Sequence, residues 1–201
     1  MPECCKLTPP KFKVMSFHNR LMNTSVACLF LANVCFGQQP VSLTSAVERQ
    51  FNQIESDVLR YAQAMPENKF DFTPESLNIN NSNFKGVRTF AGQIKHLATD
   101  NILIWSVITG DPVRTDITDV NGPKSIKSKA EVIEYLKSSF AIGRRAIATL
   151  TDKNAMDLYA FRGSKLSRLD LAFYALTHDE DHFGQMIVYC RMCGVIPPPS
   201  N

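Results

Sequence analysis

The chain has 201 residues, of which 44% are hydrophobic and 20% charged, as is ordinary for one globular domain with a sizeable core. Six cysteines are too few for a disulfide scaffold, and no apolar run approaches the ~20 residues of a membrane-spanning helix, which argues against a membrane-embedded protein. The net charge of +3 comes from residues 1–37, so residues 38–201 are neutral and lack the basic surface that nucleic-acid binding requires.

The N-terminal segment has the pattern of an export signal. Residues 1–25 are basic and irregular, residues 26–36 form an uncharged apolar run, and the small residue Gly37 follows. This order is typical of a secretory signal peptide. We therefore predict a signal peptide over 1–37, cleavage near Gly37 and a periplasmic or secreted protein. A buried N-terminal helix, a lipoprotein modified at Cys35 and a translation start at Met15 remain alternatives.

The remainder, 38–201, is predicted to form one helical domain that begins with two helices. The first covers about 43–65, with a possible capping box at Ser45 and Glu48, and ends at Pro66. After a polar loop over 66–88, the second begins at the N-cap Thr89 and ends at Gly110.

Two further helices follow after a turn-rich stretch over 111–127. The third is predicted from a capping box at Ser128 and Glu131 to about residue 150. The last begins at Ser167, with Asp170 three residues later, and ends at Gly194, where a C-terminal glycine belongs. No alternating strand pattern competes with these helices.

Each segment carries one apolar stripe with the helical spacing of three and four residues. Four helices of about 20 residues with one stripe each favour an all-α four-helix bundle. The stripes are Val47, Phe51, Ile54, Val58, Ala62 and Met65; Phe90, Ile94, Leu97, Asn101, Ile104 and Ile108; Val132, Leu136, Phe140, Ile147 and Leu150; and Leu169, Ala172, Leu176, Phe183, Ile187 and Met192.

Three histidines carry the candidate chemistry. His178 and His182 are four residues apart and therefore lie one turn apart on the same helix face, where they could chelate a divalent ion. His96, on the second helix, could meet this pair across the bundle. Three neutral imidazoles with an open position are typical of a catalytic metal site. Such a pair also occurs by chance on solvated helix faces, so the spacing alone leaves a structural role open.

Acids lie between the paired histidines. Asp179 and Asp181 are candidates for orienting the ligands or moving protons, whereas Glu180 is most simply a solvated side chain.

Two stretches resemble the DinB/YfiT superfamily of metal-binding bundles. Residues 167–170, 178–185 and the later Tyr189, Arg191, Gly194 and Pro197-Pro198 look like the family's last helix. Residues 88–98 resemble its second helix with the metal histidine, and residues 65–74 match its first loop. The resemblance covers about 43–198.

This resemblance implies a four-helix bundle that holds Zn or Ni through His96, His178 and His182. Characterised relatives include thiol S-transferases that use bacillithiol, mycothiol or glutathione and a mycothiol-dependent isomerase, and relatives are often dimers. It therefore implies a small-molecule substrate such as a low-molecular-weight thiol, and a homodimer. Where the family often reads His-Arg-Gly-Gln, this chain has Asp181 and Phe183, so a substrate contact by that arginine is not expected.

Several alternatives remain open at the level of sequence. A metal-dependent hydrolase is favoured over a thiol transferase if the chain is exported, because low-molecular-weight thiols are mainly intracellular. A non-catalytic or stress-related metal-binding bundle is a further possibility. A zincin-type protease is disfavoured because Asp179 stands where Glu is required, and di-iron chemistry because paired Glu-x-x-His motifs are lacking. Cys190 and Cys193 are most simply packing residues of the last turn, with a disulfide or accessory ligation as alternatives.

Overall fold

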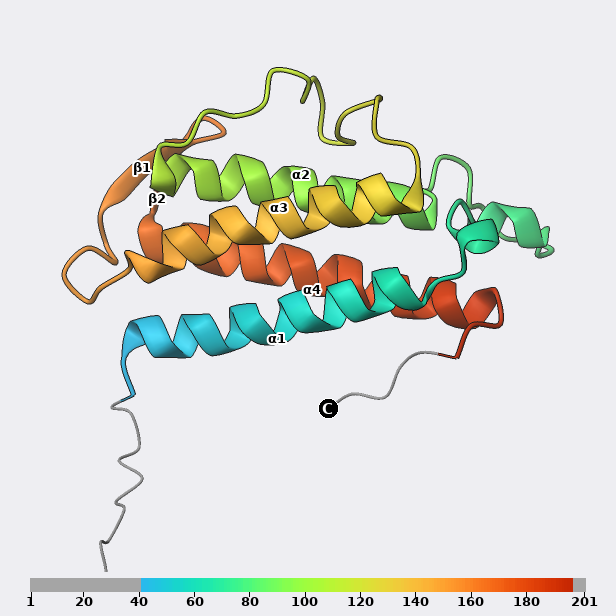
Figure 1. Ribbon diagram of the computed structural model, residues 1–201, viewed down its shortest axis with the longest axis horizontal. Helices are drawn as coiled ribbons and strands as arrows, with labels where there is room; N and C mark the ends of the chain where they lie inside the picture. Colours follow the sequence, from blue (N-terminus) through green and yellow to red (C-terminus); the bar gives the residue numbers. More distant parts are fainter. Residues whose placement is uncertain (1–40, 197–201) are drawn as a thin grey trace, which may run out of the picture. The chain divides into compact units, whose positions relative to one another are not determined.

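Four long helices and a small hairpin make up the computed structural model, which describes residues 41–196 (Figure 1). Two short 3₁₀ turns lie between the first two helices, and the hairpin leads into the last. In chain order the elements are α1 (Leu43–Ala64), η1 (Glu67–Lys69), η2 (Pro74–Leu77), α2 (Phe90–Thr109), α3 (Lys129–Ala148), β1 (Leu158–Phe161), β2 (Ser164–Ser167) and α4 (Arg168–Met192).

The helices pack as a closed four-membered bundle, as the sequence predicts. α2 packs against α3 and α4, and α1 packs against the same two helices from the opposite corner. Figure 1 shows the four helix axes running side by side along the bundle. α2 and α4 are therefore direct neighbours, so side chains on their facing sides can meet.

Local sequence signals determine where the helices begin. Thr89, Ser128 and Ser167 are N-caps whose side-chain oxygens accept hydrogen bonds from backbone N–H groups of the first turn, as predicted. The capping box predicted at Ser45 and Glu48 is wrong. The N-cap of α1 is Ser42, and Ser45 is its partner, because the helix starts three residues earlier than the predicted box requires.

The hairpin is an element that the sequence analysis missed. β1 and β2 pair antiparallel, with Phe161 opposite Ser164. Arg162 and Gly163 form the turn between them with φ values of 46° and 80°, the left-handed conformation that a two-residue hairpin turn requires. Each strand has only four residues, too few for an alternating pattern to stand out.

The core consists mainly of the predicted apolar stripes. Every predicted stripe residue of the first and third helices is buried, and Phe51 of α1 makes edge-to-face ring contacts with Trp105 of α2 and Phe140 of α3. The prediction for α4 is wrong in part, because Leu169, Phe183, Ile187 and Met192 are only partly buried. The buried face of α4 instead includes Leu171, Ala175, Asp179, His182, Met186 and Tyr189.

Residues 1–37, with the predicted signal peptide, lie outside the described residues. Within 41–196 no helix combines the length and apolar character needed to cross a bilayer.

Candidate metal centre

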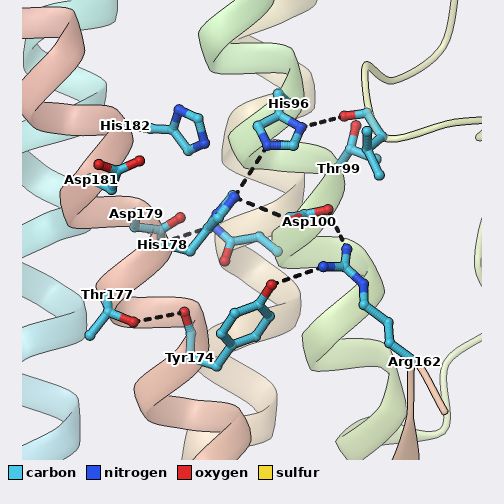
Figure 2. A network of polar contacts seen from close by, with 12 residues as sticks. His96, Thr99, Asp100, Arg162, Tyr174, Thr177, His178, Asp179, Asp181 and His182 are labelled. Carbon is cyan, nitrogen blue, oxygen red and sulfur yellow. Dashed lines mark hydrogen bonds and ion pairs between the residues drawn. The ribbon is translucent and has the colours of Figure 1, made fainter. Parts of the chain in front are cut away.

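The three predicted histidines converge between α2 and α4 (Figure 2). One ring nitrogen from each of His96, His178 and His182 lies within 4.8 Å of the other two. The Nε2 atoms of His96 and His178 are 3.2 Å apart, and the ring centroids of the three pairs are separated by 4.5–5.1 Å. The sequence placed two of these rings on one helix turn, and the bundle brings in the third.

This spacing fits a single small divalent ion. Two imidazole nitrogens that share a tetrahedral zinc ion at about 2.0–2.1 Å lie about 3.3 Å from each other. The 3.2 Å between His96 and His178 meets this requirement directly. The donor set is three nitrogens with no thiolate, which suits zinc, nickel and other transition metals and is a poor match for calcium or magnesium.

Two of the three rings are oriented by hydrogen bonds from their Nδ1 atoms. His96 Nδ1 donates to the backbone carbonyl of Val120 at 2.6 Å, and His182 Nδ1 donates to Gln93 Oε1 at 2.7 Å. Both contacts leave Nε2 as the free ring nitrogen. An acceptor on the outer nitrogen fixes the tautomer and the ring orientation in metal-binding histidines. These two rings are therefore already oriented for metal binding before an ion is bound.

A line of amide hydrogen bonds connects His182 to the predicted residue Asp181. Gln93 Nε2 donates to Gln185 Oε1 at 2.8 Å, and Gln185 Nε2 donates to Asp181 Oδ2 at 3.1 Å. Asp181 is exposed and makes this contact on the outside of α4. Two glutamines thus connect Asp181 to the His182 ring, and its orienting role stays a prediction.

We expect Gln93→Leu to weaken metal binding by about 10–100-fold, because the His182 ring loses its acceptor while the ligand itself stays in place. A competition titration with a chromogenic chelator measures the change. Gln53→Leu, which removes an exposed glutamine on α1, is the matched control and should bind as the wild type does. Equal affinities for the two variants would contradict the orienting role.

A buried carboxylate lies directly beside the histidine cluster. Asp100 is one turn beyond His96 on α2 and only 2% exposed, and its Oδ2 is 3.3 Å from His178 Nε2. Its Oδ1 accepts a hydrogen bond at 2.8 Å from Arg162 of the hairpin, which also donates to the hydroxyl of Tyr174 at 2.9 Å. Figure 2 shows the three side chains joined in this way.

The other predicted acid, Asp179, points away from the ligand atoms into the bundle. It is 1% exposed and accepts a hydrogen bond at 3.0 Å from Asn101, which in turn accepts one from Trp105. Burial raises the pKa of Asp179 well above its usual value, and the Asn101 bond opposes this only in part. The carboxyl is therefore a buried core group whose hydrogen bond to Asn101 joins α4 to α2.

Burial also lowers the pKa of two of the three histidines, His178 and His182. Desolvation lowers the pKa of His182 to about 3, and repulsion from the neighbouring histidines acts in the same direction. Desolvation likewise lowers the pKa of His178, although Asp100 opposes the shift. Only a neutral imidazole can donate its lone pair to a metal, so the metal-free site is ready to bind at neutral pH.

This depressed pKa predicts acid sensitivity of the metal-free protein. Below pH 6.5 the unfolded chain protonates His182 while the folded chain does not until about pH 3, so the free energy of unfolding should fall as the pH drops through this window. The raised pKa of Asp179 acts in the opposite direction, so a variant must isolate the histidine. Urea unfolding between these limits should show a shallower fall for His182→Gln, and parallel curves would contradict the assignment.

The two cysteines Cys190 and Cys193 lie at the end of α4. Both are free thiols, and Cys190 is buried. Burial raises the pKa of Cys190 to about 11, and the neighbouring Cys193 adds to the effect. This agrees with the simplest interpretation of the sequence, that they pack the end of α4.

Several residues of this site were not identified from the sequence. Asp100 and Gln93 lie four residues after and three before His96, and this helical spacing could have placed both on the histidine face. Arg162 had no such signal, because only the fold brings the hairpin turn to the bundle. The same is true of the Val120 carbonyl.

Comparison with solved structures supports the bundle. The fold is similar to a DinB-like protein from Bacillus cereus, with a TM-score of 0.58 and 14% identity over 78% of this chain and 97% of the other. A DinB-like protein from Bacillus subtilis, YjoA, gives a TM-score of 0.52 and 18% identity over 77% of this chain and 95% of that one. No curated protein matches the sequence significantly.

The sequence itself gives the family. The model of the DinB superfamily matches residues 50–186, which contain all three histidines of the cluster and most of the four-helix bundle. Since this match covers well over half of the chain, the family resemblance seen in the two histidine-bearing helices is confirmed. The chain belongs to the DinB superfamily.

Proposed function

We propose that this protein is a divalent-metal-dependent enzyme that activates a thiol or a water molecule at the three-histidine site. The observation that carries the proposal is the convergence of three imidazoles from two helices, each with a ring nitrogen within 4.8 Å of the others. Zinc or nickel is the occupant that we propose from the donor set. His96, His178 and His182 would hold the ion.

A divalent ion in this site would supply a Lewis acid, which lowers the pKa of a thiol or water that binds beside the histidines. The protein's own groups orient the histidine rings and shield the site. Gln93 and the Val120 carbonyl hold two rings in place, and the neutral ligands leave the cation's charge uncompensated. We propose that a reactant would arrive beside His178, because its side chain is 14% exposed.

Thiol transfer is the first of the two reactions that we propose for this site. In it the thiol sulfur forms a bond to an electrophilic carbon, the bond from that carbon to its leaving group breaks, and the thiol proton passes to solvent. With a chloronitroaromatic electrophile the leaving group is chloride. A soft thiolate is well matched to zinc or nickel, and a small-molecule thiol is therefore the proposed substrate class.

Hydrolysis is the second candidate, and the composition of residues 1–37 favours it. If this segment directs export, as we propose, the protein works where free low-molecular-weight thiols are scarce. Water would then take the place of the thiol at the same site.

Turnover measurements distinguish these activities from simple metal binding. Metal-loaded protein is assayed with a low-molecular-weight thiol and a chloronitroaromatic electrophile, and in parallel with activated esters. We expect turnover in one of the two assays. This turnover should be lost when the metal is chelated and in the variant His182→Ala. If the loaded protein and the chelated protein gave equal rates in both assays, a non-catalytic metal-binding bundle would be the better description.

A further inference from the structure

The turn of the hairpin places an arginine beside the metal centre. Arg162 has φ 46° and is followed by Gly163, so the two-residue turn carries its side chain back over the bundle. The guanidinium is 5.0 Å from the ring centroid of Phe161 and 5.9 Å from that of Tyr174. These rings and the hydrogen bonds to Tyr174 and Asp100 hold it in one orientation.

Only one carboxylate separates this guanidinium from the histidines. Asp100 accepts a hydrogen bond from Arg162 at its Oδ1 atom, and its Oδ2 atom lies 3.3 Å from His178 Nε2. The arginine side chain is 42% exposed, whereas the Asp100 side chain is 3% exposed. Arg162 therefore lies on the solvent side of Asp100, next to the histidine cluster (Figure 2).

The charges around the site leave a bound cation uncompensated. The charged side chains that act on His178 and His182 include Asp100, Asp181, Arg162 and Arg88, two of each sign. Because imidazole ligands bind a metal in their neutral form, a divalent ion would bring two positive charges into a largely buried site. Uncompensated buried charge is costly. An anionic ligand would relieve that cost.

Arg162 also has hydrogen-bonding capacity left. A guanidinium carries five N–H donors in a planar fork that matches a carboxylate. Two of them have partners among residues 41–196, Tyr174 and Asp100. The remaining donors are available to a second anion that approaches from solvent.

We propose that Arg162 binds the carboxylate of an anionic ligand whose thiol occupies the open side of the three-histidine site. The inference rests on the proposed function, which supplies the thiol, and adds the substrate class: a short thiol with a carboxylate a few bonds from its sulfur. Arg162 is the residue that selects it, and the hairpin is the element that positions Arg162.

Mercaptoacetate and its neutral amide, mercaptoacetamide, are the test probes. Each is titrated into the full chain loaded with cobalt(II), and the sulfur-to-cobalt absorption band reports binding without turnover. The quantity of interest is the ratio of the two dissociation constants, compared between wild type and Arg162→Gln. Because the same two thiols are titrated into the wild type and into Arg162→Gln, differences in thiol acidity cancel when the two ratios are compared. Arg145→Gln, which removes another partly exposed arginine paired with an aspartate, is the matched control.

We expect Arg162→Gln to reduce the preference for mercaptoacetate by about tenfold, while Arg145→Gln leaves it unchanged. An unchanged ratio in Arg162→Gln would overturn the role of Arg162 and leave thiol binding intact. If neither thiol altered the cobalt spectrum of the wild type, both the proposed thiol chemistry and this inference would fail. Should Arg162→Gln not hold cobalt, Arg162→Met applies the same test, because it keeps a long side chain and removes both the charge and the donors; a wild-type ratio there also overturns the inference.

Discussion

Elemental analysis of the purified protein should find a near-stoichiometric amount of a divalent transition metal, and much less in each of His96→Ala, His178→Ala and His182→Ala. Each variant removes one of three ligands, so two nitrogens remain to hold the ion. We expect the affinity to fall by more than about 100-fold, beyond what is typical when only a supporting residue is lost. Competition with a chromogenic chelator gives the value.

The matched control for this experiment is Glu180→Ala. Glu180 lies on α4 between the two ligands but is exposed, and it has no ring nitrogen to contribute. It should bind metal as the wild type does. Added metal should also raise the unfolding temperature of the wild type and of Glu180→Ala, but not that of the three histidine variants, because an ion that binds only the folded chain stabilises it. Equal metal content in all variants would remove the centre on which the proposed chemistry depends.

Phe51→Ala should cost about 3–5 kcal/mol of unfolding free energy, the largest stability effect that we expect from a single core truncation. Phe51 is 1% exposed and contacts the rings of Trp105 and Phe140, so it joins α1 to both α2 and α3. Its removal loses the transfer energy of the ring and leaves a cavity that three packed helices cannot fully close. Denaturant unfolding followed by circular dichroism measures the change.

Phe173→Ala provides the comparison for this truncation. The same number of atoms is removed, but Phe173 is 54% exposed on the outer side of α4. We expect a change within about 1 kcal/mol. If the two variants lost similar stability, the three-ring contact would not be the centre of the core. Metal content should stay normal in Phe173→Ala, which separates folding effects from effects on the site.

The sequence predicted the three clustered histidines better than the residues that support them. His178 and His182 share a helix face through their spacing alone, and this needs no knowledge of the fold. His96 was included by its place on another predicted helix, and the structure brings it to the pair. Asp179 has the same helical context as His178 and yet faces Asn101 in the bundle. Adjacent residues on a helix point about 100° apart, so sequence proximity to a ligand does not place a side chain at the site.

The apolar stripe of α4 was harder to predict than the others for a related reason. Its centre is occupied by Asp179 and His182, both buried, which a hydrophobic pattern counts as surface residues. The pattern therefore moved to Phe183 and Ile187, which are only partly buried. Polar residues at buried positions are where such patterns fail, and here they mark the functional helix.

The sequence by itself determined the four helices and the helical relation of His178 to His182. Capping residues and apolar periodicity act over one or two turns, and these interactions are encoded within each segment. Only the tertiary structure decided that α2 and α4 are neighbours, that Gln93 faces His182, and that the hairpin carries Arg162 to Asp100. Those contacts depend on how the helices pack and rotate against one another, which is set by the shape of the whole core.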